Sequence, residues 1–177
     1  MNKPIHAYFT QDHRRLEDLL DQASKDPKAI QEEPYHAFRV GLLTHIKMEE
    51  KILFLAAKEA NGGEPIPLAA KLRLDHGALT ALMVVPPNAA VIAAVRYILE
   101  KHDLLEEAPG GMYDICEALT KEQTADLLER LEQTTPVPVH PPNAHPIAVD
   151  SANRAMVRAG FDLYLEGGSS QGPQREE

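Results

Sequence analysis

The chain has 177 residues, 44% of them hydrophobic, which is enough for one domain with a packed core. Its formal net charge of −9 implies an acidic surface that repels phosphate backbones, and its single cysteine excludes an internal disulfide or a zinc site made of thiolates. No apolar run reaches the roughly 20 residues that cross a bilayer. We therefore expect a soluble, cytoplasmic protein that binds neither nucleic acid nor membranes.

Fourteen prolines divide the sequence into candidate helices, because proline lacks an amide N–H and clashes with the preceding helical turn. Between the prolines, apolar residues recur three and four positions apart, which is the period of a helix and not of a strand. The short breaks between these intervals make sequential helices antiparallel. The predicted fold is all-α, an antiparallel up-down-up-down four-helix bundle, with helices over 5–26, 35–64, 68–85 and 88–108.

The bundle is expected to end near residue 119. Apolar residues over 112–119 indicate that the last helix resumes after the break Pro109-Gly110-Gly111. The remaining residues are predicted to form a C-terminal helical and proline-rich extension and then a disordered tail. The predicted boundaries are 1–119 for the bundle, 120–166 for the extension and 167–177 for the tail.

Within the extension we expect a short helix, a proline-rich segment and a second short helix. Thr120 and Gln123 have the spacing of a capping box for a helix over 121–133. The sequence TTPVPVHPPNAHPIA follows and predicts an extended or polyproline-II-like strap along the surface, or a flexible linker. Asp150 or Ser151 would then cap a short amphipathic helix.

Two motifs occur twice in the chain. DHRRLEDLL at 12–20 and DHGALTALM at 75–83 both fit D-H-x-x-L-x-x-L, and HIKMEE at 45–50 and HDLLEE at 102–107 both fit H-x-x-x-E-E. The chain thus contains two helical hairpins of one design. Related by a pseudo-twofold axis, they would bring two copies of the same chemical set together at the centre of the bundle.

The repeated motifs place polar groups where the inward stripes of the helices require Leu or Ile. A His and a Glu four positions apart lie on one helix face, so each H-x-x-x-E pair presents an imidazole and a carboxylate inward. Unpaired carboxylates in an apolar core are costly, and no Lys or Arg lies on the inner stripes. Imidazole and carboxylate without thiolate suit borderline divalent metals, with iron a leading candidate, and six ligands are too many for one tetrahedral zinc. The set suits two metal ions with bridging carboxylates, and its members are His13, His45, Glu49, His76, His102 and Glu106.

In residue types and order, this set resembles the ligands of hemerythrin-like (HHE cation-binding) domains. The resemblance covers about residues 5–119 and implies a carboxylate-bridged non-haem di-iron centre, with zinc or manganese as substitutes for iron. It implies this assignment: His13 and His45 bind one iron, His76 and His102 bind the other, and Glu49 and Glu106 bridge the two.

The chain departs from the oxygen-carrying members of that family at two points. They have a fifth histidine where this chain has Thr80, and their last motif ends in Asp at a wider spacing than Glu106 here. Loss of a ligand opens a coordination position, or lets Thr80 hydrogen-bond a bound small molecule, which disfavours a reversible oxygen carrier. The set is closer to bacterial di-iron proteins of nitric-oxide stress and iron–sulfur repair. Those typically carry a cysteine-bearing N-terminal domain that these 177 residues do not include, so the repair function does not transfer directly.

Several residues beside the ligands are candidates for a supporting layer. Glu50 and Glu107 follow the ligand carboxylates and could support or replace them, or could lie on a solvated face. Thr80 lies one turn past His76, at the expected edge of the site. Asp12 and Asp75 precede ligand histidines and could orient an imidazole, or could make surface salt bridges, since neighbours on a helix diverge.

The remaining cysteine and histidines are expected to have no part in the site. Cys116, in an apolar segment, is interpreted as small core filling and not as a redox thiol. His6 and His36 lie off the predicted stripes. His140 and His145 form at most a weak metal-capturing tract on an exposed strap.

The leading hypothesis is a di-iron protein that binds or senses oxygen or nitric oxide, reacts with peroxide, or handles iron under oxidative or nitrosative stress. It is a ligand-binding protein more than a classical enzyme, because di-iron oxidases usually carry more than two carboxylates. The alternative is a module in which the metal is structural and the bundle acts in protein–protein interaction or signalling, with a protein partner that the sequence does not identify.

Overall fold

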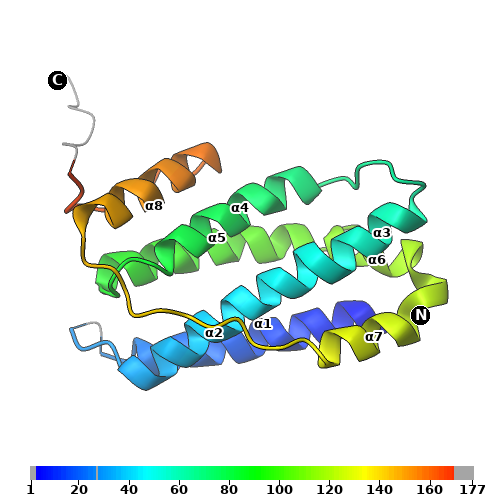
Figure 1. Cartoon of the computed structure of the whole chain (residues 1–177), viewed down its shortest axis with the longest axis horizontal. Coiled ribbons are helices and arrows are strands. Elements are labelled where there is room, and N and C mark those ends of the chain that lie inside the picture. Colours follow the sequence, from blue (N-terminus) through cyan, green and yellow to red (C-terminus); the bar gives the residue numbers. More distant parts are fainter. Residues whose placement is uncertain (1–2, 27, 170–177) are drawn as a thin grey trace.

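The computed structural model describes residues 3–26 and 28–169, which form helices and irregular segments without any strand (Figure 1). The all-α prediction is confirmed for these residues. In chain order, the elements are α1 (Pro4–Ala23), α2 (Glu32–Met48), η1 (Glu49–Leu53), α3 (Phe54–Ala60), α4 (Ala69–Leu82), α5 (Ala89–Glu107), α6 (Met112–Leu119), η2 (Lys121–Gln123), α7 (Thr124–Glu132) and α8 (Pro146–Arg158).

Four long helical segments run roughly along the longest axis of the molecule: α1, α2 with its continuation α3, α4 and α5 (Figure 1). They occupy the intervals between prolines, each within a few residues of its predicted bounds. α1 packs against α2 and α4 packs against α5, so each pair of sequential helices forms a hairpin. Asn88 begins α5, where its side chain accepts a hydrogen bond from the Val91 amide at 2.9 Å.

The predicted helix over 35–64 is interrupted by the π-helical turn η1. A π turn contains one extra residue, which rotates everything after it by about 100° relative to a continuous α-helix. The inward stripe therefore shifts by one position: Leu53 is fully buried, whereas Ile52, which a continuous α-helix would place on the face of Glu49, is only half-buried. The turn begins at Glu49, a predicted metal ligand, in keeping with the frequent occurrence of π turns at functional sites.

Two hydrophobic clusters fill the interior. One contains Phe38, Leu82 and Val95, and the other contains Phe9 and Phe54. Every long helix passes from one cluster to the other and carries its predicted ligand between them; on α1, for example, Phe9 lies in one cluster, Leu16 in the other and His13 between. The ligands therefore form a polar layer with apolar packing on both sides.

The C-terminal extension covers the outside of these helices. α7 packs beside α1 and η1, and α8 packs against α4 (Figure 1). The strap, residues 134–145, runs between them along α2 and is held by specific hydrogen bonds. The Val137 amide donates to Thr44 Oγ1 at 3.0 Å, Arg39 Nη2 donates to the His140 carbonyl at 2.9 Å, and the Asn143 amide donates to the Val84 carbonyl at 2.8 Å. The segment is an anchored strap and not a free linker.

Two predicted helix caps are wrong. The Thr120 hydroxyl donates back to the Cys116 carbonyl at 2.8 Å and accepts no hydrogen bond from the turn that follows it. α8 begins at Pro146, where His145 Nδ1 accepts from the Ile147 amide at 3.2 Å, and Asp150 therefore lies inside the helix. A proline is favoured in the first turn of a helix because its missing N–H has no intrahelical acceptor there.

Of the tail predicted to be disordered, residues 170–177 lie outside the described residues. The Ser169 amide donates to Asp150 Oδ2 at 3.0 Å, which holds the preceding stretch against α8. None of the helices described combines the length and the apolar character needed to cross a membrane.

The π turn generates a test by substitution. Leu53→Ala should lower the free energy of unfolding by about 2–5 kcal/mol, since it leaves a cavity in the core, and Ile52→Ala should cost clearly less. Urea denaturation of the two variants measures the difference. A larger loss for Ile52→Ala would mean that the helix continues without the extra residue.

Candidate metal centre

The six predicted ligands come from α1, α2, η1, α4 and α5 and meet in the polar layer. All are buried, with exposed fractions between 0% and 5%. Donor atoms of His13, His45, Glu49 and Glu106 lie within 4.8 Å of one another, and so do donor atoms of Glu49, His76, His102 and Glu106. These buried groups could hold a metal ion. The two carboxylates belong to both groups, and each pair of histidines belongs to one.

The donor atoms are better placed to bind a cation than to hydrogen-bond one another. His76 Nε2 lies 3.1 Å from Glu49 Oε2, and His102 Nε2 lies 3.2 Å from Glu106 Oε1. Even so, His76 Nε2, Glu49 Oε2 and Glu106 Oε1 are buried without a hydrogen bond. A buried polar atom without a partner costs about 1–3 kcal/mol, and a metal ion among such atoms removes that cost.

A carboxylate stands behind every imidazole of the site. In each case Nε2 faces the interior and Nδ1 faces the carboxylate. For His13, His45 and His76 the contact is a hydrogen bond, which fixes the tautomer and the orientation of the ring, whereas His102 and Asp75 are only within ion-pair distance. The Nδ1-to-oxygen distances are 2.6 Å for His13 to Glu107, 2.8 Å for His45 to Asp12, 2.9 Å for His76 to Glu50 and 3.5 Å for His102 to Asp75.

The supporting carboxylates follow the internal repeat. The Asp of each D-H motif contacts the histidine on the other helix of its own hairpin, and the second Glu of each H-x-x-x-E-E motif contacts the D-H histidine of the opposite hairpin. Asp12 and Asp75 therefore turn away from the histidines beside them in sequence, as expected, but they do orient an imidazole. The repetition of these residues within the motifs was the available signal.

Thr80, expected at the edge of the site, is exposed on α4 and belongs to neither donor group. Four residues advance a helix by about 400°, so Thr80 is rotated about 40° from His76, and that rotation takes it to the surface. The predicted contact of Thr80 with a bound small molecule is not supported.

Tyr113 is a site residue that sequence reasoning missed. Its hydroxyl donates to Glu49 Oε1 at 2.6 Å and lies 3.0 Å from both Glu106 Oε2 and His13 Nε2. It comes from α6, after the glycine break. A Cβ on Gly111 would lie 2.6 Å from the Leu105 carbonyl oxygen, so only glycine allows the chain to turn tightly enough to bring Tyr113 back to the site. The one signal was a tyrosine among the apolar residues of the segment that follows a ligand motif.

Charge within the site favours a protonated His45 next to an ionised Glu49. Burial alone lowers the pKa of His45, but the Glu49 carboxylate and the hydrogen bond to Asp12 outweigh it and raise that pKa to about 10. Burial raises the pKa of Glu49, and the opposing interactions with His45 and His76 bring it well below its ordinary value. The pKa of the Tyr113 hydroxyl is raised by burial and by the two carboxylates, so it remains a donor.

The other residues considered from the sequence belong to neither donor group. Cys116 is buried, and burial raises the pKa of its thiol, which fits core filling and opposes a reactive thiolate. His36, His140 and His145 are exposed, and His6 is half-buried with Nε2 at 3.2 Å from the Glu107 carbonyl.

Comparisons with known proteins found no match: no family model fits the sequence, and no curated protein and no solved structure matches it significantly. The chemistry of the site is therefore inferred from its own residues alone.

Tyr113→Phe should lower the free energy of unfolding of the metal-free protein by about 1–3 kcal/mol, because Glu49 loses its buried donor. Chemical denaturation in the presence of a chelator measures the loss. Tyr8→Phe is the matched control, since its hydroxyl reaches only Met48 Sδ at 3.7 Å and should cost much less. Equal losses would contradict the placement of Tyr113.

The raised pKa of His45 predicts how the stability of the metal-free protein depends on pH. His45 binds its proton more tightly in the folded state, so its contribution is complete below its unfolded pKa of about 6.5. That contribution is lost as the pH rises through the folded value of about 10. The free energy of unfolding should fall over this interval, and His45→Gln should flatten the fall. An unchanged slope in the variant would contradict the assignment.

Proposed function

We propose that the protein is a hemerythrin-like, non-haem di-iron protein in which α1, α2, α4 and α5 form an antiparallel up-down-up-down four-helix bundle around the metals. The observation that carries this proposal is the pair of overlapping donor groups, which share Glu49 and Glu106 and differ in their histidines. One metal would leave the donors of the other group unpaired, whereas two metals with bridging carboxylates use all six. The donors are imidazole and carboxylate without thiolate, a set that suits iron.

The chain's own residues would prepare the site for these metals. The four supporting carboxylates hold each Nε2 toward the interior, and Tyr113 holds a proton at Glu49 Oε1. The hydrophobic clusters on both sides of the polar layer exclude bulk water. When bound, a pair of irons would supply coordination and electron exchange to a small molecule.

A small cavity supports a diatomic ligand over a larger substrate. It lies beside His13, His45 and His102, and its volume of about 20 Å³ is a little more than the roughly 10–15 Å³ that one water molecule needs. Leu42 and Leu79 are among the apolar residues that line it. Oxygen, nitric oxide or a peroxide would fit such a space, and an organic substrate would not. We therefore propose binding or sensing of a small diatomic ligand, or iron handling under oxidative or nitrosative stress.

The alternative is a metal that only holds the helices together, in a module for protein interaction. The near-complete burial of all six ligands favours it. Under this alternative zinc restores folding fully, and Glu49→Gln lowers stability without removing any small-ligand chemistry.

The decisive experiment is metal analysis of the protein purified without a tag or added metal, followed by spectra. We expect about two irons per chain and new charge-transfer bands when the reduced protein meets oxygen, peroxide or nitric oxide. His45→Ala and His102→Ala each remove a ligand from a different group and should lower the metal content. His36→Ala, at an exposed histidine of α2, is the control and should leave it unchanged.

Two outcomes would contradict the proposal. Retention of two metals per chain in both His45→Ala and His102→Ala would show that the ligands are wrongly assigned. No spectral change of the iron-loaded protein with any of the three small molecules would favour the structural alternative.

A further inference from the structure

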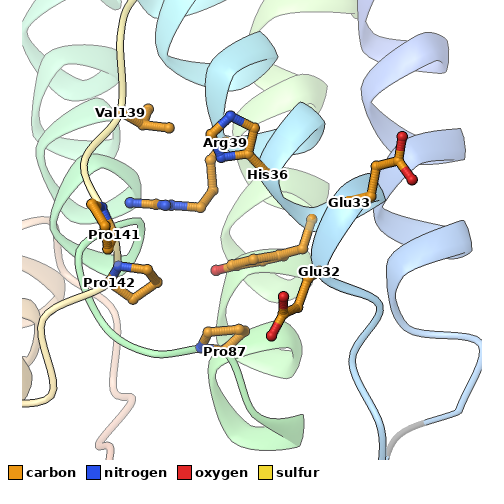
Figure 2. A pocket seen from close by; sticks show the side chains of 9 residues that line it. Glu32, Glu33, His36, Arg39, Pro87, Val139, Pro141 and Pro142 are labelled. Carbon is orange, nitrogen blue, oxygen red and sulfur yellow. The ribbon is translucent and has the colours of Figure 1, made fainter.

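A second cavity, of about 600 Å³, lies outside the metal centre (Figure 2). The first turns of α2 form one wall, Pro87 between α4 and α5 forms another, and Val139, Pro141 and Pro142 of the strap close it. The volume is within the range of sites that hold small organic molecules. Because proline fixes its own backbone angle, these walls are largely preformed.

Arg39 brings an unpaired positive charge to this cavity. Its side chain is only 5% exposed and extends from α2 toward Pro141 (Figure 2). Nε donates to the Met83 carbonyl at 2.8 Å and Nη2 to the His140 carbonyl at 2.9 Å, but Nη1 has no hydrogen bond. Among the residues that the structure describes, no carboxylate lies within 4.0 Å of the guanidinium. A buried charge without a counter-ion is costly, and a guanidinium is well matched in shape to a carboxylate.

Tyr35 brings a second unpaired donor. It lies one helical turn before Arg39, lines the same cavity and is 3% exposed. Its hydroxyl is buried and has no hydrogen-bond partner. Burial raises the pKa of Tyr35 to about 12 although Arg39 opposes the shift, so the hydroxyl keeps its proton near neutral pH. Two donors four residues apart on one helix face thus lack an acceptor.

The rest of the lining limits what the acceptor can be. Pro87, Pro141, Pro142 and Val139 offer apolar contacts to the body of a ligand. Glu32 and Glu33 are exposed at the rim, and Glu33 points away from the strap (Figure 2). Their charges are largely screened by water, yet they still disfavour an anion of higher charge such as phosphate.

We propose that this cavity binds a small organic monocarboxylate. Its carboxylate accepts hydrogen bonds from Arg39 Nη1 and the Tyr35 hydroxyl, and its apolar body packs on the prolines of the strap. The site shares no residue with either donor group of the metal centre, so the proposal is independent of which metal the protein holds.

Benzoate tests the proposal as a probe, with benzyl alcohol, benzylamine and inorganic phosphate as matched comparisons. The full chain is titrated while its backbone amides are followed by NMR. Benzoate should shift the amides of 35–39 and of Val139, His140 and Asn143 with a saturable curve, and the other three probes should not. Equal shifts with benzyl alcohol, or stronger binding of benzylamine, would overturn the proposal.

Substitutions separate binding from folding. Tyr35→Phe should weaken benzoate binding severalfold and leave the melting temperature unchanged, because the lost hydroxyl has no partner in the protein. Arg39→Lys keeps the charge but loses the planar fork and should weaken binding by about tenfold or more. Arg96→Gln, at an exposed arginine paired with Asp21, is the control and should bind like the original protein. Unchanged affinity in both Tyr35→Phe and Arg39→Lys would overturn the proposal.

Discussion

Glu49 and Glu106 are completely buried in a helical interior, where a carboxylate is costly unless positive charge and hydrogen-bond donors surround it. Most of the polar side chains in and around the site meet this requirement. Four imidazoles face the two carboxylates, a second ring of carboxylates stands behind the imidazoles, and cations at the surface pair with three of the four members of that ring. Arg14 contacts Glu107 at 2.6 Å, Arg15 contacts Asp12 at 2.7 Å, and Lys71 pairs with Asp75. Acidic and basic side chains thus alternate from the centre to the solvent.

The hydrophobic clusters on either side of the polar layer make this alternation effective. They lower the local dielectric constant, which strengthens each pairing and raises the cost of any donor left without a partner. The same environment couples the helices to the site. A helix that moved along its axis would bring a leucine into the polar layer and a histidine into a cluster, so the position of the ligands and the register of the helices are fixed together.

Much of the fold and of the site follows from periodicity and repetition in the sequence. The proline intervals predicted the helices, and the doubled motifs predicted six residues that the structure brings together. The π turn was not predicted because no particular residue type marks a turn with one extra residue. Its effect is seen only in the packing, where Leu53 and not Ile52 lies in the core. Tyr113 escaped because it reaches the site across a glycine break, where helical spacing carries no information. Arg39 escaped because its acceptors, the Met83 and His140 carbonyls, belong to backbone distant in sequence.

The strap has a consequence for the pairing of the two hairpins. It is bonded to Thr44 and Arg39 on the first hairpin and to the Val84 carbonyl at the end of α4 on the second, so both hairpins are fastened to one segment. Separating the hairpins therefore requires breaking the hydrogen bonds of the strap as well as the contacts of the core.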